Sequence, residues 1–121
     1  MLEIDLEHRD SFEPGEEIEV GVSWDMRLDP TQVQLRVVWN TSGKGTQDVE
    51  VAHQVALESP RKRERRQVRV SLPSEPYSFS GRLISVVWAL ELIALPSKLS
   101  TRREIIIAPG GQEVLAKGRG R

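Results

Sequence analysis

Cysteine is absent from this sequence, and long hydrophobic runs are scarce. Because there are no thiols, disulfides and thiolate metal sites are excluded, and a reducing compartment is permitted. The most apolar stretch, residues 83–95, contains Ser85 and Glu91 and is shorter than the about 20 residues that a membrane-spanning helix needs. Residues 1–10 lack the basic head and apolar core of a secretory signal, so we expect a cytoplasmic protein without a membrane anchor.

Length and charge indicate one compact unit. A chain of 121 residues, 38% hydrophobic and 29% charged, fits a single domain with one core. The net charge is −1, but acidic side chains are concentrated in residues 1–30 and basic ones in the remainder. This asymmetry allows a polarised binding surface, or acidic and basic strands that lie side by side and neutralise each other. We favour the second interpretation and expect Arg36 or Arg69 to partner acidic residues of other strands.

Alternating hydrophobic and polar residues indicate β-strands throughout the chain. Runs of proline, glycine and small polar residues separate them. The predicted strands are residues 2–6, 17–24, 33–39, 49–57, 68–72, 82–94 and 103–108. About seven strands without a helix predict an all-β fold, an antiparallel β-sandwich with immunoglobulin-like architecture over residues 1–108. Residues 109–121 are predicted to be a flexible basic tail.

The segment 82–94 has two possible structures. Its "WALELIAL" portion contains good helix formers. Gly81 precedes it, however, and Val86, Trp88 and Leu90 form an alternate row typical of a strand in the middle of a sheet. We therefore predict a long central strand with Trp88 as the main core aromatic.

Two segments carry a family resemblance: "SFEPGEEIEVGVSW" at 11–24 and "LPSEPYSFSGRLISVVWALEL" at 72–92. Their order and spacing resemble the arrestin-like superfamily, as a single arrestin-type half-domain similar also to retromer-subunit and sporulation-protein relatives. The residues that match its structural motifs are Pro14, Gly15, Pro76, Phe79, Gly81 and Trp88. The resemblance implies a sandwich that presents sheet edges and end loops to a protein partner.

The motif residues have structural roles irrespective of family. Pro14 fixes φ and Gly15 can adopt a positive φ, so together they reverse the chain. Phe79 is expected to plug one end of the sandwich. Ile84 stands where the arrestin pattern usually has a second glycine, so this turn must differ in detail.

Catalytic and metal-binding patterns are missing from the sequence. His8 and His53 are the only imidazoles, and neither lies in a motif with a nucleophile or metal ligand. We expect no enzyme activity, no metal and no cofactor. His53 is in phase with Val51 and Val55, so we expect it to be partly buried on a strand.

The segment "RKRERR" at 61–66 is the sharpest candidate for partner binding, and we place it in a hairpin loop. Its basic residues are Arg61, Lys62, Arg63, Arg65 and Arg66. The charges could dock a partner, or they could only keep a hairpin from edge-to-edge aggregation.

Three functions remain open. The first is a non-enzymatic adaptor or scaffold that binds a protein partner through an edge strand or the loops at 41–46, 61–66 and 96–101. The second is a module for nucleic acid or anionic membrane that uses the basic segment and the terminal "KGRGR". The weakest is a sandwich for carbohydrate or another small ligand, which requires an exposed tryptophan such as Trp24 or Trp39.

Overall fold

The computed structural model describes residues 1–43, 49–80, 84–111 and 114–115. These residues form strands joined by turns, with one short 3-10 helix, η1 (Pro109–Gly111). The seven predicted strands correspond to seven of the observed ones, and the additional strands β2, β7 and β10 have two residues each. The strands are β1 (Leu2–Asp5), β2 (Ser11–Phe12), β3 (Glu17–Asp25), β4 (Gln32–Gly43), β5 (Val49–Leu57), β6 (Arg63–Ser71), β7 (Phe79–Ser80), β8 (Ile84–Leu95), β9 (Leu99–Ile107) and β10 (Val114–Leu115).

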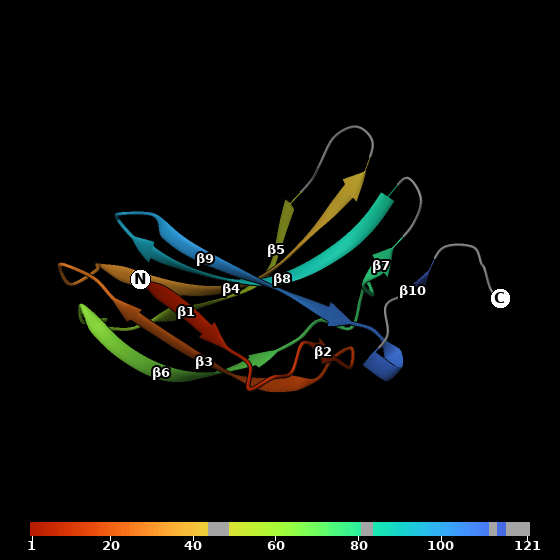
Figure 1. Ribbon diagram of the computed structural model, residues 1–121, viewed down its shortest axis with the longest axis horizontal. Coiled ribbons are helices and arrows are strands. Elements are labelled where there is room, and N and C mark those ends of the chain that lie inside the picture. Colours follow the sequence, from red (N-terminus) through yellow and green to blue (C-terminus); the bar gives the residue numbers. More distant parts are fainter. Residues whose placement is uncertain (44–48, 81–83, 112–113, 116–121) are drawn as a thin grey trace.

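Two sheets form the predicted sandwich (Figure 1). The three-stranded sheet has the order β1-β3-β6, and the seven-stranded sheet has the path β10-β7-β8-β4-β5, with β9 on β8 and β2 on β9. The long neighbours pair antiparallel, as predicted, whereas the short pairs β2–β9 and β7–β10 are parallel. The core lies between the sheets, and its largest fully buried side chains include Trp24, Trp88, Leu35 and Leu90.

The central position of β8 confirms the strand prediction for the apolar segment. It pairs with β4 along its whole length and with β7 and β9 on its other edge. Trp88, Leu90 and Leu92 face the core and are fully buried. The Nε1–H of Trp88 donates a 2.7 Å hydrogen bond to the carbonyl of Pro76, which ties the turn before β7 to the core.

A β-bulge in β5 overturns the predicted burial of that strand. His53 pairs with Val37, but the next pair joins Val51 to Val38, so Ala52 is an extra residue on β5. Because side chains alternate between faces, one extra residue moves all that precede it to the opposite face. The alternate residues of 49–57 that were expected on one face of the strand are therefore divided between its two faces.

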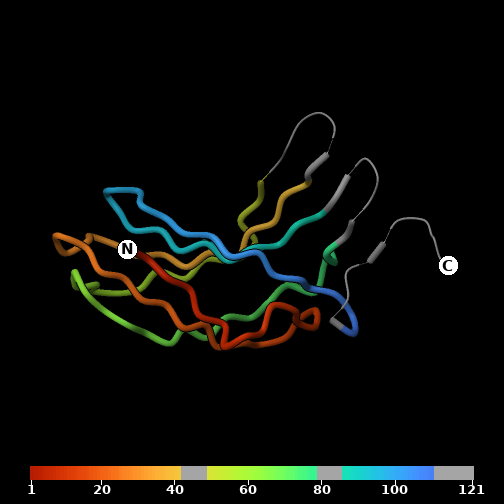
Figure 2. The backbone as a smooth tube through the Cα atoms, in the orientation of Figure 1, coloured from red at the N-terminus to blue at the C-terminus, as the bar shows by residue number. Residues whose placement is uncertain are grey.

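The consequences are visible in the burial of β5. Leu57 is buried and Val55 is partly buried, but Val49 and Val51 are exposed. The prediction that His53 is partly buried is wrong, since it is exposed; the bulge does not cause this, because His53 still pairs with the core residue Val37. Beyond the bulge, the parts of β4, β5 and β8 nearest residues 44–48 and 81–83 turn away from the three-stranded sheet (Figures 1 and 2).

The Pro-Gly turn has the predicted conformation. Gly15 has φ 76°, and Glu16 N–H donates to the carbonyl of Glu13 at 3.1 Å. The turn is joined to the β6–β7 connection, because Gly15 N–H donates to Pro73 O at 3.1 Å.

Some predictions lie outside the described residues. In β7, the backbone of Phe79 pairs with Val86 of β8. The side chain of Phe79, which was expected to plug the sandwich, and Gly81 lie outside the described part of the structure. In the predicted tail, Val114 and Leu115 pair with β7, and residues 112–113 and 116–121 are not described.

Candidate functional site

The basic segment lies mostly on a strand, which corrects its predicted placement in a loop. Arg63, Arg65 and Arg66 belong to β6, and only Arg61 and Lys62 precede it. Strand alternation sends the three strand residues in two directions: Arg63 and Arg65 are exposed, whereas Arg66 is half-buried.

Arg66 contacts the core residue Trp24 and the β5–β6 connection. Its guanidinium lies over the ring of Trp24, 5.8 Å from the centroid, and donates to the Glu58 carbonyl at 2.8 Å and to Glu64 at 3.0 Å. The pKa of Glu64 is lowered, first by the hydrogen bond from the backbone N–H of Arg61 and then by Arg66. This arginine is therefore committed to internal contacts.

The backbone at Arg61 and Lys62 fastens the β5–β6 connection. Trp24 Nε1–H donates to Arg61 O at 2.6 Å, and Met26 N–H donates to Lys62 O at 2.7 Å. Lys62 N–H in turn donates to a carboxylate oxygen of Asp29 at 2.7 Å. The segment thus has a structural role, and its binding of a partner stays a prediction.

Acidic and basic strands meet on the outer face of the three-stranded sheet. Arg63 forms an ion pair with Asp25 at 3.1 Å, and Arg69 lies 3.6 Å from both Glu17 and Glu19. These contacts support the interpretation that the charge asymmetry along the chain is neutralised between neighbouring strands.

The tryptophans offer no exposed ring for stacking. Trp24 and Trp88 are 1% and 0% exposed. Trp39 is half-buried, with its ring centroid 6.1 Å from that of Trp88. The carbohydrate hypothesis required an exposed tryptophan, so this arrangement counts against it.

Titratable side chains form no cluster of metal-binding type within the described part of the chain. In the same residues, no helix is long and apolar enough to cross a membrane.

The outer edge of β5 is the first candidate interface. It is the last strand on its side of the seven-stranded sheet, so its outer backbone edge has no neighbour in the described sheet path. Val49 and Val51 are 62% and 49% exposed. Their partners across the pair are Asn40 and Val38, which are 6% and 2% exposed. The sequence pattern did not reveal this surface, because the uninterrupted row from Val49 to Leu57 gives no sign of a bulge.

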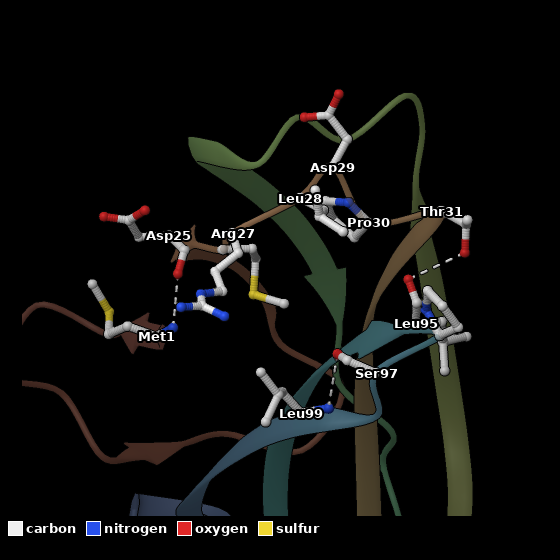
Figure 3. Close-up of a pocket in the computed structure, with 12 residues that line it drawn as sticks. Met1, Asp25, Arg27, Leu28, Asp29, Pro30, Thr31, Leu95, Ser97 and Leu99 are labelled. Atoms are coloured by element: carbon white, nitrogen blue, oxygen red, sulfur yellow. Dashed lines mark hydrogen bonds between the residues drawn. The ribbon is translucent and has the colours of Figure 1, made fainter.

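A second candidate is an apolar hollow of about 590 Å³ at one end of the sandwich (Figure 3). It lies between the β3–β4 connection and the β8–β9 turn. The hydrophobic residues that line it include Met1, Met26, Leu28, Pro30, Leu95 and Leu99. The sequence predicts the turn at 96–101 as a binding loop, but it does not predict a role for the β3–β4 residues. The sequence indicates this part of the hollow only by the apolar residues Met26 and Leu28, which stand within an otherwise polar connection.

Comparisons with known proteins support the fold. The two-sheet architecture corresponds to the predicted arrestin-like sandwich. Among solved structures, it is similar to the sporulation control protein Spo0M from Bacillus subtilis, with a TM-score of 0.62 and 16% sequence identity. The match covers 89% of this chain and 49% of Spo0M, so the chain spans about half the length of that protein. No protein-family model matches, and no curated protein shows significant sequence similarity.

Proposed function

We propose that this chain is a non-enzymatic interaction domain that adds an extended segment of a protein partner to the edge of β5. The observation that carries the proposal is an open strand of nine residues, exposed from Val49 to Gln54. An unpaired edge presents backbone N–H and C=O groups that a second chain can satisfy. The similarity to Spo0M supports the sandwich that presents this edge, and the adaptor role and the cytoplasmic location remain proposals.

The composition of β5 sets it apart from a protected edge. Proteins usually shield edge strands with lysine or other charged residues, or with proline. The sequence of β5, "VEVAHQVAL", has one carboxylate, no lysine, no arginine and no proline. One edge strand of the other sheet, β6, carries arginines at Arg63, Arg65, Arg66 and Arg69, and its other edge strand, the four-residue β1, carries Glu3 and Asp5. Of these three strands, only β5 therefore has the composition expected for strand addition.

The exposed valines indicate what the partner segment contains. Side chains branched at Cβ pack well against neighbours on the pleated surface of a sheet. A partner strand beside β5 would place every second side chain next to Val49 or Val51. We therefore expect an extended segment with β-branched residues at alternate positions.

Hydrogen exchange with a defined peptide tests the proposal. The probe is a synthetic peptide of alternating valine and threonine, N-methylated along one edge so that it cannot form a sheet with itself. Binding is expected to slow amide exchange along β5. The double substitution Val49→Lys with Val51→Lys is expected to weaken binding at least tenfold, because two charges would face apolar side chains.

Leu28→Glu is the matched control, since Leu28 is also an exposed hydrophobic residue but lies at the end of the sandwich. It should leave peptide binding unchanged. Protection that appears on β6 or at the hollow, or binding that survives both lysines, would refute strand addition at β5.

A further inference from the structure

The apolar hollow has the size and lining of a binding site, and strand addition at β5 gives it no role. Its volume of about 590 Å³ lies within the range of about 300–1,000 Å³ typical of small-molecule sites. Leu28 and Leu99 stand at its rim and are 80% and 51% exposed, which is costly for two large hydrophobic side chains on one surface.

Several backbone groups around the hollow are already paired. Met26 N–H donates to Lys62 O at 2.7 Å, and Thr31 N–H donates to Leu95 O at 2.9 Å. Leu99 N–H donates to the hydroxyl of Ser97 at 3.3 Å. These groups are not available to the backbone N–H and C=O groups of a bound peptide, and burying such groups without a hydrogen bond costs free energy. An alkyl chain requires no hydrogen bonds, so it fits this lining better.

The mouth of the hollow carries charges of both signs. Asp25 pairs with Arg63 at 3.1 Å, and Asp29, which keeps its negative charge, accepts a hydrogen bond from Lys62 N–H. Arg27 lines the hollow as well, and its side chain extends toward Met1 (Figure 3). Within the described residues, Arg27 forms no ion pair. The cations at the mouth are Arg27 and the N-terminal ammonium of Met1, which donates to Asp25 O at 2.9 Å, so the guanidinium of Arg27 is available to a ligand carboxylate.

We propose that the hollow binds a fatty-acid anion, with the alkyl tail against the apolar lining and the carboxylate at Arg27. The site is separate from β5 and does not depend on strand addition there.

Titration with decanoate and decanol, followed by calorimetry and by amide chemical shifts, tests the site. Both probes should bind with saturation and shift the amides of residues 26–29, 31 and 97–99. Arg27→Gln should weaken decanoate binding about threefold, the effect of losing an exposed charge pair, and leave decanol binding unchanged. Leu28→Glu with Leu99→Glu should weaken both probes more than tenfold. Both leucines are exposed, so these substitutions leave the core intact.

Val49→Lys with Val51→Lys is the control, because it should weaken peptide addition at β5 at least tenfold and leave decanoate binding unchanged. The proposal is overturned if decanoate does not saturate below its micelle concentration, or if Leu28→Glu with Leu99→Glu leaves its affinity unchanged. A short apolar peptide that shifts the same amides while decanoate does not would equally overturn it, and would assign the hollow to a protein side chain.

Discussion

Gly15 is the residue whose chemistry most directly determines the backbone. Its φ of 76° lies in the left-handed region, and an added Cβ would meet nothing nearer than Ser74 Cβ at 4.0 Å. The cost of a side chain there is therefore conformational and not steric. Gly15→Ala should lower the free energy of unfolding by about 1 kcal/mol, measured by urea denaturation.

Gly21 is the matched control for this substitution. It has no positive φ, and an added Cβ would lie 3.4 Å from Asp5 Cβ and Gln67 Nε2. Gly21→Ala should change stability by less than about 0.5 kcal/mol. Equal losses at the two positions would show that the turn conformation is not the cause.

Glu16 makes stability depend on pH. Arg9 donates two hydrogen bonds of 2.7 Å to its carboxylate, and the backbone N–H of Glu13 donates a third at 2.9 Å. These contacts lower the pKa of Glu16 below the ordinary glutamate value near 4.5. The carboxylate therefore stabilises the fold fully above that value, and the contribution is lost as pH falls through the lowered pKa.

Thermal unfolding between pH 7 and about pH 2 measures this contribution. Glu16→Gln should lower the midpoint at neutral pH and flatten its decline in acid. Arg9→Gln should produce the same change, because the pair acts as a unit. An unaltered acid decline in both variants would contradict the assignment.

Strand β5 is the element in which exposure and sequence pattern disagree. Because Val49 and Val51 are exposed, replacing both with lysine should change the free energy of unfolding by less than about 0.5 kcal/mol. Leu57→Lys, on the same strand but 8% exposed, should lower it by more than about 2 kcal/mol. Urea denaturation of the two variants compares the ends of one strand. A large loss in the double lysine variant would mean that the valines are buried after all.

The whole molecule combines two acidic strands with a basic one. Contacts of Arg63 and Arg69 with β3 distribute the charge across one sheet face. Since β6 arginines take part in these ion pairs, the charge available for nucleic acid or anionic membrane is smaller than the sequence alone indicated. Within the basic segment, that alternative is left with the side chains of Arg61, Lys62 and Arg65, and the terminal "KGRGR" lies outside the described residues.

Several features followed from the sequence alone. The alternating rows in β1, β3, β4 and β6 defined the sandwich, since burying one face of a strand requires period two. Pro14 and Gly15 defined a turn because few residues tolerate its geometry, and the apolar row around Trp88 defined the central strand.

Tertiary structure decided what lies on the surface. The extra residue Ala52 reverses the faces of β5, and alternation within the segment gave no sign of it, since bulges depend on how two strands pair. The hollow at the end of the sandwich is lined by Leu28 and Leu99, which are far apart in the chain. Arg66 and Trp24 are also far apart in the chain, so local patterns did not predict their contact. Local patterns determine which residues form strands, whereas binding surfaces arise where separate segments meet in space.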